Sequence, residues 1–197
     1  MPNFDPLTYR YSSRRNVVYA KNGVCCTSVP LGAQVGLDVL KNGGNAVDAA
    51  VAMAGAMPLL EPTGNGLGSD CFALVWIEKE KKLYGLNASG VAPMALSADE
   101  VRAKGFSEVP EEGWIPTMVP GAPTGWAALN RRFGTKPLSE LFAPAISYAE
   151  NGYAVPVNVG KLWAHDSRRI ARVMAQDPAP YEYWWKSFMK PDGSPYR

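Results

Sequence analysis

The chain has 197 residues, of which 47% are hydrophobic and 19% are charged. This composition supports one domain with a packed core and excludes a globally disordered chain. The net charge of +2, from 20 basic and 18 acidic side chains, does not indicate the basic surface patch that nucleic-acid binding needs. The longest apolar stretch, residues 49–60, is shorter than the roughly 20 residues that a membrane helix needs. Residues 1–5 do not start a secretory signal, so we expect a cytoplasmic protein that binds neither nucleic acid nor membrane.

Three cysteines and a single histidine limit the metal chemistry of the chain. Cys25 and Cys26 are adjacent, Cys71 is distant, and no CxxC spacing occurs. A structural zinc site needs about four nitrogen or sulfur ligands. We therefore expect reduced thiols, no metal and no cofactor.

The N-terminal part is predicted to consist of an arm followed by short strands. Residues 1–16 are polar and irregular, and we interpret them as an extended arm before a domain that covers 17–197. Residues 16–26 contain short β-prone runs separated by Asn22-Gly23, which is a strong turn dipeptide.

Two helices are predicted next. Apolar residues repeat at helical spacing over residues 31–42, and Gly43-Gly44 ends that helix. Asn45 can cap the next helix, with Asp48 in its first turn. Residues 46–57 are almost all small and apolar, which predicts a central helix buried on every side.

A glycine-rich loop at residues 61–69 precedes a predicted hairpin, with strands at 71–77 and 83–86 joined by a charged turn. A phosphate-binding loop would lead into a helix and would carry a lysine, whereas this loop leads into a strand and carries none. We interpret it as a tight backbone passage between a buried helix and a buried strand.

The second half is predicted to be mainly helical. Ser97 and Glu100 form a capping box for a short helix that ends before Gly105. Longer helices are expected at residues 124–133, 138–151 and 158–176, with a kink or break at Pro144. After an aromatic segment the chain stops partway through the fold that we expect.

Taken alone, the residues contain no complete catalytic constellation, and we assign no catalytic residue. The single histidine, His165, lies in a predicted helix rich in arginine and is interpreted as a surface residue. Cys71, beside the glycine loop, is the one candidate nucleophile, against the alternative of an inert buried thiol.

Two further groups have a functional and a structural interpretation. Glu61 and Asp70 flank the glycine loop and could act as a carboxylate pair, or could bind backbone amides there. Trp184 and Trp185 could form a platform for a sugar or peptide, or could pack on a missing or partner segment.

The order of several motifs resembles the γ-glutamyltransferase family. Residues 43–52 read GGNAVDAAVA, and Glu61-Pro62 precedes the glycine loop and a β-run. Pro120-Gly121, then RFG, LF, PAI and ENGY at residues 132–153, are similar to the following block of that family. The likeness covers residues 17–197 in consistent order.

The resemblance implies an α/β (α+β) chain that forms the helix-rich, large-subunit portion of a four-layer αββα sandwich, the N-terminal-nucleophile hydrolase fold. In that family a precursor cuts itself into a large and a small subunit. The new N-terminal threonine of the small subunit attacks an amide carbonyl, with its own α-amine as base. The acyl group then passes to water or to an amine.

This chain departs from the family pattern in two respects. The family's threonine lies on a segment beyond residue 197, so the implied partner is the small subunit or the rest of the same precursor. γ-Glutamyl enzymes also carry an arginine that binds the substrate carboxylate, where this chain has Ser89. Asn87 and Ser89 are therefore the candidate substrate-binding residues. A branch that acts on other small amides, similar to cephalosporin acylases or oxamate amidohydrolases, is favoured, and a non-catalytic member or fragment is the alternative.

Overall fold

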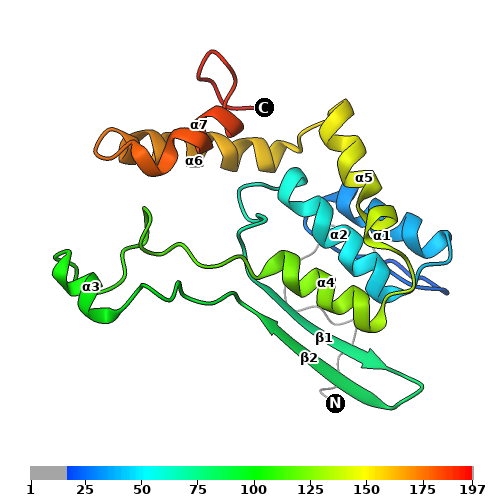
Figure 1. Cartoon of the computed structure of the whole chain (residues 1–197). Coiled ribbons are helices and arrows are strands. Elements are labelled where there is room, and N and C mark those ends of the chain that lie inside the picture. Colours follow the sequence, from blue (N-terminus) through cyan, green and yellow to red (C-terminus); the bar gives the residue numbers. More distant parts are fainter. Residues whose placement is uncertain (1–16, 197) are drawn as a thin grey trace.

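The computed structural model describes residues 17–196, so the arm predicted at residues 1–16 lies outside the described part. Two strands and seven α-helices with one 3₁₀ helix make up the described chain (Figure 1). In order they are α1 (Pro30–Lys41), α2 (Ala46–Leu60), β1 (Cys71–Ile77), β2 (Lys82–Ala88), α3 (Ala98–Ala103), α4 (Ala122–Phe133), α5 (Leu138–Asn151), α6 (Val157–Met174), η1 (Ala179–Tyr181) and α7 (Glu182–Phe188).

The α1–α2 pair forms where the sequence predicts it. Pro30 occupies the first turn of α1, where its missing N–H costs no hydrogen bond. Asn45 caps α2 by accepting hydrogen bonds from the backbone of Val47 and Asp48. The two helices approach closely because a Cβ added at Gly36 would lie 2.7 Å from the Met53 side chain.

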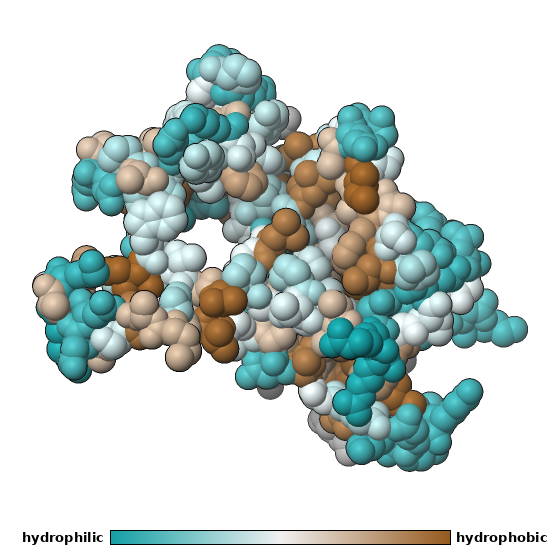
Figure 2. All heavy atoms as spheres, in the orientation of Figure 1, coloured by the Kyte–Doolittle hydropathy of each residue, from teal (hydrophilic) through white to brown (hydrophobic). Residues whose placement is uncertain are grey.

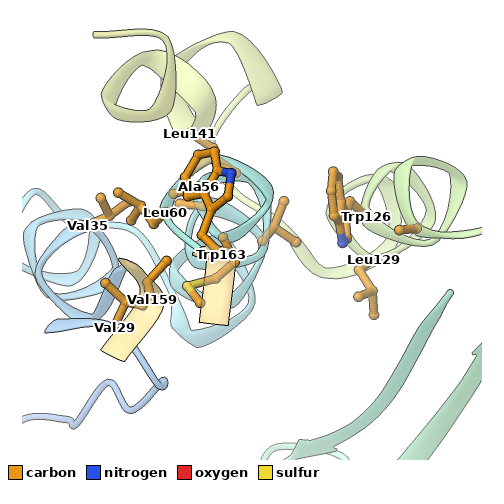
Figure 3. Packing of buried hydrophobic residues seen from close by; sticks show 13 residues of the cluster. Val29, Val35, Ala56, Leu60, Trp126, Leu129, Leu141, Val159 and Trp163 are labelled. Carbon is orange, nitrogen blue, oxygen red and sulfur yellow. The ribbon is translucent and has the colours of Figure 1, made fainter. Parts of the chain in front are cut away.

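The hydrophobic core surrounds α2 (Figure 3). Leu60 is fully buried and Leu141 of α5 is 1% exposed, while Trp126 and Leu129 approach from α4. Trp163 of α6 also packs into this cluster. One continuous core therefore joins α2 to α4, α5 and α6.

The hairpin pairs β1 with β2 in antiparallel register, with Phe72 opposite Asn87 and Trp76 opposite Leu83. Its inner face packs on α4, and a Cβ at Gly125 would lie only 2.9 Å from Cys71 Cβ. The outer face is apolar but exposed over Phe72, Leu74, Trp76 and Leu83. The described chain thus has helices on one side of a sheet whose other side is open.

Two predictions about local structure are wrong, and a third is narrowed. Residues 17–26 contain no strand, because no neighbouring strand pairs with them, and Val18 is 80% exposed. The faces of α2 are not all buried, since Ala50 lines an open hollow. α5 continues through Pro144, so of the two predicted alternatives, a kink or a break, the break is excluded.

The prediction of a long helix at residues 158–176 is confirmed by α6, the longest helix described. The aromatic segment after it folds into η1 and α7, which return to pack on α6. The Trp163 indole N–H donates to the Phe188 carbonyl at 2.8 Å. Trp184 lies 5.7 Å from the Phe188 ring, so this aromatic cluster packs within its own chain.

Candidate substrate site at the end of the hairpin

Asn87 and Ser89 lie together where β2 ends. Asn87 is on the outer, exposed face of the hairpin, and its Oδ1 accepts a hydrogen bond from the Ser89 N–H at 3.0 Å. The Ser89 hydroxyl donates to the Gly90 carbonyl at 3.2 Å. These local bonds fix the turn by which the chain leaves the strand.

Two glycines form a tight backbone crossing beside this turn. Gly90 has a φ of +80°, and a Cβ there would lie 2.1 Å from the Val119 carbonyl oxygen. A Cβ at Gly121 would lie 2.1 Å from the Ala88 carbonyl oxygen. Only glycine fits at either position, and the crossing places the start of α4 next to Ser89.

The crossing borders a hollow of about 540 Å³. It is lined by residues 86–91 of the hairpin end, residues 119–121, and Thr124, Gly125 and Ala128 of α4. These lining residues include no arginine, lysine, histidine or acidic residue. The hollow therefore offers hydroxyl, amide and backbone groups to a ligand, and no cation for a carboxylate.

The glycine loop has a different structure from the predicted one. A Cβ at Gly68 would meet nothing within 4 Å, so the interpretation as a tight passage is wrong for this stretch. The Glu61 carboxylate accepts from the Ser28 hydroxyl at 2.6 Å and from the Asn65 amide at 2.9 Å. Glu61 thus binds side chains and ties the loop to the segment before α1.

Cys71 and His165 are the remaining candidates. Burial, together with the negative charge of Asp70, raises the pKa of the Cys71 thiol. A raised pKa disfavours the thiolate that a nucleophilic cysteine needs. His165 is exposed on α6, as predicted, with Nδ1 3.5 Å from Asp166 Oδ1. Among residues 17–196, no cluster of three or more His, Cys, Asp or Glu side chains could hold a metal ion.

Asn45 and Asp48 of the GGNAVD motif connect the start of α2 to residues 133–136. The sequence does not predict these distant partners. The Asp48 carboxylate is fully buried and accepts from the backbone of Asn45, Thr135 and Lys136 and from the Thr135 hydroxyl. The Asn45 amide donates to the Phe133 carbonyl at 2.7 Å. Burial acts to raise the Asp48 pKa, but these hydrogen bonds outweigh it and lower the pKa.

The sequence matches the γ-glutamyltranspeptidase family model over residues 32–197. The chain is 31% identical over 172 residues to the glutathione hydrolase proenzyme of Bacillus subtilis, covering 85% of this chain and 29% of the relative. The chain belongs to the γ-glutamyltranspeptidase family. It spans 22–29% of the length of the curated relatives that it matches.

Two solved structures are similar in fold. Cephalosporin acylase from Bacillus halodurans aligns with a TM-score of 0.87 and 52% identity, covering 98% of this chain and 35% of that one. Helicobacter pylori γ-glutamyltranspeptidase aligns with a TM-score of 0.81 and 29% identity, covering 92% of this chain and 50% of that one. These similarities confirm the expected fold class, a helix-rich α+β portion of the N-terminal-nucleophile hydrolase type.

None of the described helices, all within residues 17–196, combines the length and the apolar composition that a membrane span requires.

Proposed function

We propose that this chain is the front part of the large subunit of a self-processing amide hydrolase or acyltransferase. The family match over residues 32–197 supports this assignment. In the proposed reaction, a threonine hydroxyl on another segment of the precursor attacks the amide carbonyl. The amine leaves with the proton, and the acyl ester on the threonine is then cleaved by water or by an acceptor amine.

In this proposal the domain of residues 17–197 is incomplete by itself and pairs with the remaining part of the precursor. The apolar outer face of the hairpin supports such pairing, because Leu74 is 78% exposed and Phe72 is 62% exposed. Large apolar side chains that share one sheet face are usually covered by another layer. Since the nucleophile is on the other part, the chain by itself should have no amidase turnover.

Asn87 and Ser89 bind the substrate side chain or acyl group in this scheme. The proposed substrate class rests on one observation: no charged side chain lines the hollow next to Asn87 and Ser89. A γ-glutamyl group presents a free carboxylate, and a buried carboxylate without a partner costs several kcal/mol. The proposed substrate is therefore a small amide whose acyl group reaches the Ser89 end without a free α-carboxylate.

The identity of 52% to a cephalosporin acylase favours the acylase-like branch of the family over the γ-glutamyl branch. The second candidate is a glutathione hydrolase, which the B. subtilis relative supports at 31% identity. In that case a cation from another part of the precursor would supply the missing charge.

Two substrates distinguish these candidates. The chain is co-expressed with the remaining part of its precursor, and hydrolysis of an N-acylated cephalosporin is compared with that of a γ-glutamyl anilide. We expect turnover of the acylated compound with the higher kcat/KM. Preference for the γ-glutamyl anilide would overturn the substrate class, and absence of both activities in a self-cleaved protein would favour a non-catalytic family member.

A further inference from the structure

Residues 92–118 form an arm that leaves the body of the molecule and returns at one point (Figure 1). At its base the Val119 N–H donates to the Val91 carbonyl at 3.0 Å, beside the glycine crossing described above. The arm carries α3, of which only Val101 is buried. Its base is thus fixed, whereas little hydrophobic burial holds its outer part.

The part of the arm after α3, residues 108–113, is called its tip, and it contacts the α6–α7 region through polar groups. Glu112 forms an ion pair with Arg169 of α6. The Gly113 N–H donates to the Tyr181 hydroxyl of η1 at 3.1 Å. Both contacts join segments that are more than fifty residues apart in sequence, and both can break without exposing a packed core.

Further charges lie close in sequence to each partner of this ion pair. Residues 108–112 contain three acidic side chains, and α6 contains three arginines within five positions, one of which pairs with the arm. The acidic residues are Glu108, Glu111 and Glu112, and the basic ones are Arg168, Arg169 and Arg172. Opposite charges of this kind attract the tip toward α6 at low ionic strength.

Arg169 also lines a cavity of about 140 Å³. Aromatic walls come from Trp163, Trp184 and Phe188, and the opposite wall comes from Pro62 and Thr63 of the glycine loop. The Thr63 hydroxyl is the one buried side-chain polar atom within residues 17–196 that lacks a hydrogen-bond partner. Figure 2 shows an opening between the arm, the α6–α7 region and the body of the molecule.

We propose that residues 108–113 are an electrostatic strap that closes onto α6 and η1 and controls access to the cavity beside Arg169. An ion pair with this exposure contributes little to stability, so closed and open positions lie close in free energy. Such a balance lets salt, or an acidic group that competes for Arg169, release the strap. The strap belongs to the arm, and its closing does not depend on which substrate the protein takes.

Hydrogen exchange by mass spectrometry on the full chain tests the strap. We expect Glu112→Gln and Arg169→Gln each to speed exchange of residues 108–113 by about twofold to fivefold, as loss of an exposed pair allows. Tyr181→Phe should have a similar effect, since it removes only the hydroxyl. The charge-exchanged pair Glu112→Arg with Arg169→Glu should restore slow exchange.

The indole N–H of Trp163, which lines the cavity and donates to the Phe188 carbonyl, tests access to the cavity when it is observed by NMR after ¹⁵N-tryptophan labelling. Its exchange with solvent should quicken in Glu112→Gln and at about 0.5 M salt, where screening weakens the strap. Asp99→Asn is the matched control, because Asp99 pairs with Arg102 inside α3 and contacts nothing on α6. Unchanged exchange in Glu112→Gln and Arg169→Gln, or an equal change in Asp99→Asn, would overturn the proposal.

Discussion

Replacing Asp48 with asparagine should destabilise the fold substantially although the side chain keeps its shape. Asp48 is 0% exposed, and its two oxygens accept four hydrogen bonds, three of them from backbone N–H groups. In the best orientation the new amide NH₂ replaces Oδ2. It can then donate to the Thr135 hydroxyl, but it points a donor at the Asn45 N–H.

The magnitude follows from this count of donors. One buried N–H without an acceptor costs about 1–3 kcal/mol. The remaining bonds also lose the assistance of the negative charge, which brings the expected loss to about 2–4 kcal/mol. The free energy of unfolding, measured by urea titration with circular dichroism, provides the test.

Asp38→Asn is the matched control, because it makes the same chemical change on an exposed surface of α1. Its expected effect stays within about 0.5 kcal/mol. If Asp48→Asn lost no more stability than Asp38→Asn, the argument from buried hydrogen bonds would be refuted.

The same carboxylate predicts a pH dependence. Because the Asp48 pKa is lowered in the folded state, its stabilisation is present above the unfolded pKa of about 3.9 and is lost as pH falls from there through the lower folded pKa. The difference in stability between wild type and Asp48→Asn should therefore shrink between about pH 5 and pH 3. A difference that stayed constant over this range would contradict the assigned hydrogen bonds to the ionised form.

Three further predictions concern the hairpin end. Ser89→Arg in the intact precursor should lower KM for a γ-glutamyl anilide by about tenfold or more, since a charged hydrogen bond contributes about 1.5–3 kcal/mol; an unchanged KM would place the substrate carboxylate elsewhere. Gly125→Ala should lower the free energy of unfolding by about 1–3 kcal/mol, because the new methyl would lie 2.9 Å from Cys71 Cβ and 3.0 Å from Ala88 Cβ; equal urea midpoints would refute this close packing. Iodoacetamide should alkylate the exposed Cys26 faster than Cys71, whose pKa is raised by burial; mass mapping that finds Cys71 modified first would contradict this order.

Local patterns were sufficient to predict most of the helices and the hairpin. The cap at Asn45, the alternation in Cys71–Ile77 and the glycine after α5 each depend on neighbouring residues alone. The β-prone runs before residue 27 failed for the opposite reason. A strand needs a partner, and the residues around Val18 have none in the described chain.

The candidate site shows the same limit. Asn87 and Ser89 were assigned by resemblance, and their hydrogen-bonded turn lies within three residues. The neutral hollow next to them depends on residues 119–121, which the hairpin sequence does not specify. Likewise, no pattern around Asp48 points to Thr135, because that contact joins segments 87 residues apart.

The closed base of the arm has a consequence for how this chain tolerates change in length. Because a hydrogen bond joins Val91 to Val119, the two ends of the arm are already held together without the residues between them. A short linker could replace the arm, residues 92–118, and the chain would still connect the hairpin to α4 in the same way. Gly90 and Gly121 at its root would have to remain in such a shortened chain, because a Cβ at either position would clash with the opposite backbone.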